Sequence, residues 1–195
     1  MQALNRNIYN WPNFVSLLRL LMAPVLIGLA VNQQPVWFLA VVLFSAFTDA
    51  LDGFLARLLN QITELGSHLD SWGDFFIYNC MAVGAWLLWP DIVLREKLSF
   101  IVIVASFTLP ATAGLIKFHT LTSYHTWSVK LAVLLTYIGY TLLFAGLLDW
   151  PFRLAAVACA YAGIEEIAIT LLVRQQHIDV RSLLQALRNQ RGGGD

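Results

Sequence analysis

The sequence predicts an all-α integral membrane protein, built as a bundle of six transmembrane helices. Hydrophobic residues make up 58% of the 195 residues and charged residues only 12%, and the mean hydropathy is +0.67. A soluble domain of this size does not carry so much apolar surface. Six apolar segments are long enough to cross a hydrocarbon core of about 30 Å, and tryptophans recur near their ends, as in an interfacial aromatic belt.

The six predicted spans divide the chain into three parts. The spans are residues 14–31, 36–59, 70–89, 98–118, 127–148 and 152–173. Short breaks rich in Pro, Asn, Gln and Asp separate several of them, which is ordinary loop chemistry. We expect residues 1–13 to form an N-terminal juxtamembrane segment, residues 14–174 one six-helix transmembrane domain, and residues 175–195 a cytoplasmic C-terminal tail.

The positive charges predict the orientation. With the N-terminus in the cytoplasm, nine Lys and Arg residues fall on the inner side and three on the outer side. The inner set includes Arg19, Arg57, Lys117 and Lys130. This asymmetry places both termini in the cytoplasm. The formal net charge is zero, which gives no indication of a nucleic-acid partner.

Four aspartates near the junction of the second and third predicted spans are the most informative residues. They are Asp49, Asp52, Asp70 and Asp74. Each would cost roughly 2.5–3.5 kcal/mol at the centre of a membrane helix, whereas a Leu or Ile returns only ~0.3–0.6 kcal/mol. We therefore expect them to line a hydrated cavity near the cytoplasmic ends of their helices.

Helical spacing predicts that these carboxylates form two pairs. Asp49 and Asp52 are three residues apart, and Asp70 and Asp74 are four apart, so each pair shares one helical face. Like charges this close need cations to neutralise them. Oxygen ligands suit Mg²⁺ or Mn²⁺, and two such ions form the usual clamp for in-line displacement at phosphorus. The sequence thus predicts a site for two divalent cations.

Small residues and one arginine accompany the aspartates and complete a motif. The full pattern is Asp49-x2-Asp52-Gly53-x2-Ala56-Arg57-x8-Gly66-x3-Asp70-x3-Asp74. The glycines leave room for a substrate to approach the backbone, and the arginine supplies a planar cation suited to a phosphate. All eight fixed positions resemble the signature of the CDP-alcohol phosphatidyltransferase family, at the family's spacing.

The resemblance implies a homodimeric enzyme of phospholipid biosynthesis with a cytoplasm-facing active site, so that residues 14–174 would be its catalytic domain. Such an enzyme transfers a phosphatidyl-type group from a CDP-linked lipid to an alcohol and releases CMP. By the same resemblance the first three aspartates bind metal, and Asp74 serves as the base and as a further ligand. The residues implied to contact the CDP donor are Asp49, Asp52, Gly53, Ala56, Arg57 and Gly66.

Two other classes of protein also place carboxylates in a membrane. A cation transporter or channel would explain the aspartates, but it would not explain Arg57 and the glycines of the motif. An intramembrane prenyl transferase also binds metal through aspartates, but its usual pattern lacks the Asp-Gly-x2-Ala-Arg segment.

The acceptor is the least determined part of the prediction. Lys117, His125 and Lys130 lie at the predicted inner ends of the fourth and fifth spans, where they could hold a phosphate or anchor the helices at the membrane surface. Glu165 and Glu166 could line a substrate cavity or make structural hydrogen bonds. The sequence leaves open serine, inositol phosphate, glycerol phosphate or a second phospholipid as acceptor. It also leaves open which lipid backbone the donor carries and whether the metal is Mg²⁺ or Mn²⁺. Whether transfer is direct or passes through a covalent intermediate is open as well.

Overall fold

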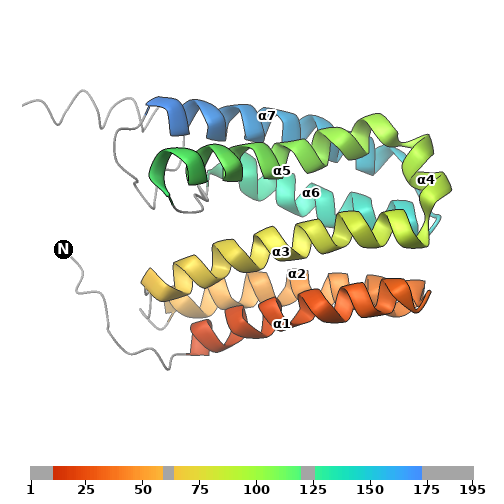
Figure 1. The fold of residues 1–195 in the computed structure, drawn as a ribbon, viewed down its shortest axis with the longest axis horizontal. Coiled ribbons are helices and arrows are strands. Elements are labelled where there is room, and N and C mark those ends of the chain that lie inside the picture. The colour runs from red at the N-terminus through yellow and green to blue at the C-terminus, as the bar shows by residue number, and fades with distance from the viewer. Residues whose placement is uncertain (1–10, 59–63, 120–125, 173–195) are drawn as a thin grey trace, which may run out of the picture. The chain divides into compact units, whose positions relative to one another are not determined.

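The computed structural model describes residues 11–58, 64–119 and 126–172, with the side chains at 11–16, 50, 52–58 and 64–70 left out of the description. The described residues form seven α-helices (Figure 1). The all-α prediction is therefore confirmed. The chain divides into two compact units, Met1–Asp91 and Ile92–Asp195.

The first unit is built around helix α1 (Trp11–Val31), which packs against both α2 (Pro35–Leu58) and α3 (Glu64–Leu88). Helices α2 and α3 contact each other much less. The buried apolar side chains of this unit include Leu26 and Ala30 of α1, Phe38 and Val42 of α2, and Ile77, Met81 and Ala85 of α3. Gly84 of α3 lies against the ring of Phe38, and a Cβ there would come within 2.3 Å of that ring.

Helix α3 begins earlier than predicted, at Glu64 instead of Asp70. The expected loop over residues 60–69 is thus partly helical, and Gly66 lies in the first turns of α3. No proline interrupts residues 64–70, and a glutamate at the start of a helix interacts favourably with the helix dipole. Gly66 destabilises the helix by up to ~1 kcal/mol relative to alanine, which is too little to prevent helix formation when the neighbouring residues favour a helix.

The second unit is built around α7 (Trp150–Leu172), which packs against both α5 (Lys97–Phe118) and α6 (Trp127–Phe144). Glycines allow these close approaches. A Cβ on Gly139 of α6 would come within 2.8 Å of the backbone of Phe152, and one on Gly163 within 3.1 Å of Ser106. Small residues at helix contacts are typical of membrane bundles, because they let helix backbones approach closely.

Helix α6 ends at Phe144, four residues before the predicted end of that span. Gly146 has φ 73°, and its N–H donates to the carbonyl of Leu143, while the N–H of Leu147 donates to the carbonyl of Leu142. This pair of hydrogen bonds is a Schellman motif, in which a left-handed glycine ends the helix. The sequence signal for this helix end was Gly146, which follows a long apolar run.

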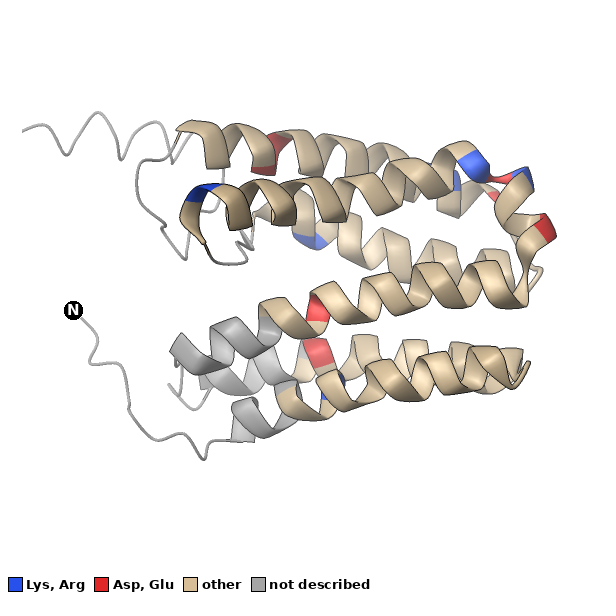
Figure 2. Ribbon diagram, in the orientation of Figure 1, with Lys and Arg blue, Asp and Glu red and all other residues tan. Residues whose placement is uncertain are grey.

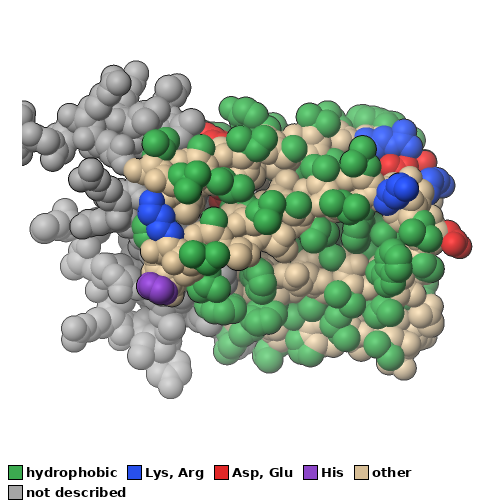
Figure 3. Space-filling model, turned by 45° about the horizontal axis from the view of Figure 1, so that its top comes forward, with side chains coloured by type: hydrophobic (Ala, Val, Ile, Leu, Met, Phe, Trp, Pro, Cys, Tyr) green, Lys and Arg blue, Asp and Glu red, His purple; other side chains and the backbone are tan. Residues whose placement is uncertain are grey.

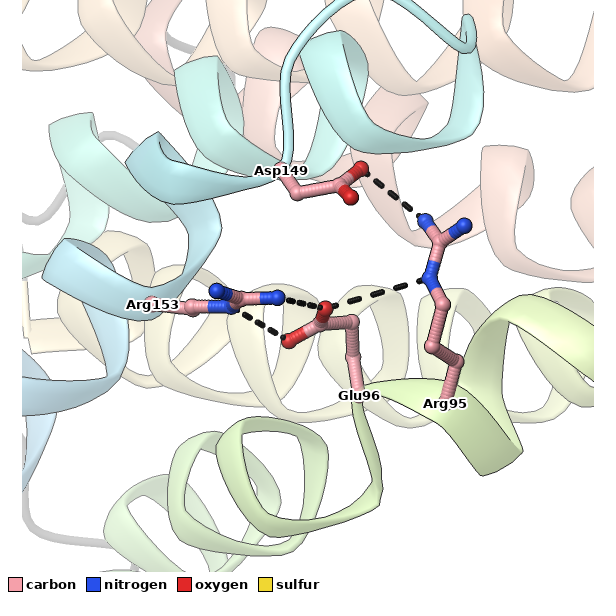
Figure 4. A network of polar contacts seen from close by, with 4 residues as sticks. All are labelled: Arg95, Glu96, Asp149 and Arg153. Carbon is pink, nitrogen blue, oxygen red and sulfur yellow. Dashed lines mark hydrogen bonds and ion pairs between the residues drawn. The ribbon is translucent and has the colours of Figure 1, made fainter.

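A short helix, α4 (Pro90–Arg95), was not predicted and lies where the two units join in sequence. Pro90 at its first position and Asp91 in its first turn are both favourable at a helix start. Arg95 at its end and Glu96 after it form a charged network with Asp149, which precedes α7, and Arg153 in the first turn of α7 (Figure 4). Arg153 donates to both carboxylate oxygens of Glu96 at 2.6 and 3.0 Å, and Arg95 donates to Asp149 at 2.9 Å.

Glu96 is 5% exposed and immediately precedes α5. The hydrogen bonds from Arg153 lower the pKa of Glu96, although burial of the carboxylate opposes this shift. The pair therefore ties the start of α5 to the start of α7 with a charge-assisted, bidentate contact.

The apolar helices make the chain a multi-pass membrane protein. Helices α5, α6 and α7 are each long and apolar enough to cross a bilayer, and the described residues add two shorter apolar stretches, Leu17–Val31 and Pro35–Asp49. Large hydrophobic side chains are exposed along the helices, among them Ile101, Ile116, Leu131, Val157 and Ile164. Figure 3 shows hydrophobic side chains spread over the helices, with charged ones gathered at the α4 end of the second unit.

Candidate active site

Two of the four motif aspartates have described side chains, and they converge on one arginine. Arg19 of α1 donates through Nη1 to Oδ1 of Asp49 on α2, and the same Nη1 lies 3.6 Å from Oδ1 of Asp74 on α3. The acidic positions of α2 and α3 lie at the same level of the first unit (Figure 2). One residue of each predicted pair thus lies at the same arginine nitrogen.

The burial of these groups is unequal. The Arg19 side chain is 0% exposed, whereas the side chains of Asp49 and Asp74 are 31% and 24% exposed. The guanidinium therefore lies inside the three-helix unit, while each carboxylate keeps an accessible side. That arrangement suits carboxylates that bind a further cation on the side away from the arginine.

Gly73 provides the space for the buried guanidinium. A Cβ at this position of α3 would come within 3.1 Å of Nε of Arg19. Contacts of that length are tighter than ordinary van der Waals separation, so a larger residue would push the arginine side chain aside. The glycine next to Asp74 thus leaves room for the Arg19 guanidinium to reach the aspartates of α2 and α3.

A buried arginine of this kind needs its partners. Removing one partner of a buried ion pair costs about 3–5 kcal/mol, because the remaining charge is left uncompensated. This is a large fraction of the 5–15 kcal/mol that stabilises a typical domain. The fully buried Arg19 therefore depends on the aspartates more than these partly exposed carboxylates depend on it.

The other motif positions belong to helices, but their side chains lie outside the described residues. Asp52, Gly53, Ala56 and Arg57 fall in α2, and Gly66 and Asp70 fall in α3. Within the part of the chain whose side chains are described, no group of three or more His, Cys, Asp or Glu residues could hold a metal ion. Asp49 and Asp74 nevertheless fit a hard divalent cation, since both present carboxylate oxygens from facing helices.

The residues predicted to hold a phosphate differ in their surroundings. Nζ of Lys117 donates to the carbonyls of Thr170 and Leu171, at 2.8 and 3.0 Å, and so caps the C-terminal end of α7. Nζ of Lys130 lies 5.4 Å from the ring centroid of Trp127, and the residue is exposed. His125 lies outside the described residues. The structure thus gives Lys117 a structural contact within its unit.

Glu165 is held by a hydroxyl from the start of α6. Oγ of Ser128 donates to Oε2 of Glu165, and the same Oγ lies 2.8 Å from Oγ1 of Thr126, the residue that caps α6. Glu166, next in sequence, is buried. Glu165 thus makes a hydrogen bond within its unit, which is one of the two roles that the sequence left open for these glutamates.

Arg19 is the residue that the sequence analysis missed, since it was counted only as one of the inner positive charges. The available signal was a charge inside an otherwise apolar segment, residues 14–31. A charged residue in a membrane helix is expected to face the bundle interior and to pair with an opposite charge. The motif aspartates were the obvious candidates for the carboxylate that pairs with Arg19.

The fold and the site together define a multi-pass α-helical membrane protein with a carboxylate pair fixed by a buried arginine. A family model described as CDP-alcohol phosphatidyltransferase matches residues 9–164, which is most of the chain. The chain belongs to the CDP-alcohol phosphatidyltransferase family.

Several curated proteins are similar to parts of the chain. A CDP-diacylglycerol–glycerol-3-phosphate 3-phosphatidyltransferase of Cereibacter sphaeroides is 31% identical over 147 residues, covering 67% of this chain and 65% of that protein. The Aquifex aeolicus protein of the same name is 43% identical over 65 residues, covering 33% and 36%. The cardiolipin synthase (CMP-forming) of Homo sapiens is 32% identical over 120 residues, covering 61% and 39%. The matches thus span less than two thirds of each relative's length. No solved structure matches the chain.

Proposed function

We propose that the protein transfers a phosphatidyl-type group from a CDP-linked lipid to an alcohol and releases CMP. The observation that carries this proposal is the convergence of Asp49 and Asp74 from α2 and α3, in a chain that belongs to the CDP-alcohol phosphatidyltransferase family. The family match disfavours the two alternatives, a cation transporter or channel and an intramembrane prenyl transferase.

The four motif aspartates are the proposed ligands of two divalent cations per subunit, Mg²⁺ or Mn²⁺. Asp49 and Asp74 supply oxygens from facing helices, and the helical spacing of Asp52 and Asp70 puts them on the same faces. When bound, the cations would neutralise the donor diphosphate and polarise the phosphorus that is attacked. Asp49 and Asp52, with Gly53, Ala56, Arg57 and Gly66, are the proposed contacts of the CDP donor.

Asp74 is the proposed general base. Its carboxylate accepts the proton of the acceptor hydroxyl as the alcohol oxygen attacks the phosphorus nearer the lipid. A new phosphorus–oxygen bond forms to the alcohol, the diphosphate bond breaks, and CMP leaves with the electron pair of that bond. The partly exposed face of Asp74 supports this role, because a base must be within reach of its substrate.

The architecture we propose keeps six membrane-spanning helices in a homodimer, with residues 14–174 as the catalytic domain. The six long helices support this count, and the nine-to-three distribution of positive charges supports cytoplasmic termini and a cytoplasmic active site. Protease accessibility of tags at both termini in sealed vesicles checks the orientation, and the mass of the detergent-purified particle checks the dimer.

Glycerol 3-phosphate is the first acceptor to test, because the names of two of the relatives specify it. Serine, inositol phosphate and a second phospholipid are the other candidates. Lys130 is the proposed contact of a substrate phosphate, since it is exposed and its Nζ lies over the ring of Trp127. Lys117 is a weaker candidate, because it already binds two carbonyls, and His125, which lies outside the described residues, stays a candidate from the sequence alone.

The first prediction tests the reaction itself. Purified protein incubated with CDP-diacylglycerol, a panel of these acceptors and Mg²⁺ or Mn²⁺ should release CMP and form one lipid product. Chelation should abolish turnover, because the donor diphosphate and the carboxylates repel each other without cations. Undiminished CMP release after exhaustive chelation would remove the metal site from the proposal. Cation flux into liposomes with no CMP release from any acceptor would favour the transporter class.

The second prediction compares two lysines. Lys130→Ala should raise the KM of a phosphate-bearing substrate by tens-fold, consistent with ~2 kcal/mol from a charged hydrogen bond, and should leave the Tm unchanged. Lys117→Ala is the matched control, and it should lower the Tm with little effect on KM, because it removes the cap of α7. Steady-state kinetics and thermal unfolding of both variants measure this. Equal KM values for Lys130→Ala and the unsubstituted protein would leave Lys130 with an anchoring role only.

The third prediction separates a metal ligand from a base. Asp52→Asn removes a charge from the metal site, so the affinities for metal and donor should both fall. Asp74→Asn should leave donor affinity largely intact and lower kcat by ~10²–10⁴, as expected for a lost general base. Donor affinity and turnover are measured for both variants at saturating metal. Loss of donor binding in Asp74→Asn as complete as in Asp52→Asn, or near-normal turnover, would contradict the assignment of the base.

A further inference from the structure

Arg19 is a charged residue of the candidate site that lies outside the family motif. It comes from α1, which contributes none of the motif residues, and it contacts an aspartate from each half of the motif. The guanidinium is fully buried between α1, α2 and α3, and Gly73 provides the space for it. A simple anchoring charge at a membrane surface would instead extend its end group into water.

The position of Arg19 gives it two effects on the carboxylates. First, its positive charge offsets part of the repulsion between Asp49 and Asp74, which come from different helices and would otherwise push α2 and α3 apart. Second, the hydrogen bond from Nη1 fixes the direction of the Asp49 carboxylate, and the same nitrogen attracts the Asp74 carboxylate 3.6 Å away. Both effects operate in the protein before any divalent cation binds.

We propose that Arg19 is a positioning residue that acts as the built-in counter-cation of the carboxylate site. It holds Asp49 and Asp74 together in the metal-free protein, and its charge weakens the attraction of the site for divalent cations. Arg19 thereby keeps the site assembled when no metal is bound. It also makes the affinity of the site for metal lower than it would be without the arginine. This inference rests on the proposed function, since it assumes that these aspartates bind divalent cations.

A purely structural role for Arg19 makes a different prediction. If the arginine only packs α1 against α2 and α3, its loss lowers stability equally with and without metal. If it is a counter-cation, metal compensates for its loss, because a bound divalent cation supplies the missing positive charge. The dependence of stability on metal therefore distinguishes the two roles, and it requires neither donor nor turnover.

The experiment measures the Tm of the detergent-purified full-length protein against Mn²⁺ concentration, beginning in a chelator. Arg19→Met should lower the metal-free Tm by roughly 5–10 °C, because Asp49 and Asp74 lose the positive charge between them and repel each other. Saturating Mn²⁺ should recover more than half of that loss. The Mn²⁺ midpoint, here the apparent Kd obtained from the rise of Tm with Mn²⁺ concentration, should fall several-fold, because a cation that binds the folded protein more tightly stabilises it at a lower concentration.

Three further variants make the result interpretable. Arg19→Lys keeps the charge, so its Mn²⁺ midpoint should stay near that of the unsubstituted protein even if its Tm falls. Arg153→Met breaks the charged pair with Glu96 in the other unit and should lower the Tm equally at all Mn²⁺ concentrations. Should Arg19→Met not yield folded protein, the double variant Arg19→Met/Asp49→Asn also removes one of the two carboxylates that would repel each other, and it should be recovered in folded form.

Each outcome decides the proposal. A parallel fall in Tm for Arg19→Met at every Mn²⁺ concentration, with an unchanged midpoint, would overturn the counter-cation role while leaving the metal site intact. A double variant no more stable than Arg19→Met alone would overturn it as well. An absence of any Mn²⁺ effect on the unsubstituted protein would overturn the metal site and this inference together.

Discussion

The need to pair every charge placed among apolar helices governs this structure. Hydrocarbon offers no partner to an ion, and an isolated charge is costly there. Arg19 accordingly pairs with Asp49 and lies near Asp74, and Arg153 pairs with Glu96 in the second unit. The first pair joins α1 to α2, and the second joins the start of α5 to α7. Charges that would be costly alone thus become contacts that fix the positions of helices.

The two ion pairs differ in how much of each carboxylate is left accessible to other ligands. Glu96 is 5% exposed and is bound by both nitrogens that Arg153 presents, so little of the carboxylate is left for other ligands. Asp49 and Asp74 keep accessible sides while the arginine between them is buried. A carboxylate with one side fixed and the other side open is suited to binding a cation or accepting a proton. We therefore propose that the first unit carries the chemistry and that the network near α4 is structural.

Helical periodicity predicted more of this arrangement than hydropathy did. The three- and four-residue spacings predicted facing carboxylates, and the structure brings Asp49 and Asp74 to one arginine. Hydropathy alone misplaced two boundaries, because it could not register the early start of α3 at Glu64 or the Schellman turn at Gly146. Arg19 was missed for a related reason. Counting the positive charges on each side of the membrane gives no information about which carboxylate each positive charge pairs with. That pairing depends on the packing of α1 against α2 and α3, which no local pattern encodes.

The central claim is that the carboxylates of α2 and α3 bind the divalent cations used in the transfer. Electron paramagnetic resonance of Mn²⁺ bound to the purified protein tests it most directly. Two magnetically coupled ions per subunit are expected, as in two-metal sites with ions about 4 Å apart. Asp49→Asn should remove the coupling, while Glu166→Gln, a buried carboxylate of the second unit, should retain it. A coupled Mn²⁺ pair that survives in Asp49→Asn and is lost in Glu166→Gln would place the metal site elsewhere and contradict the account.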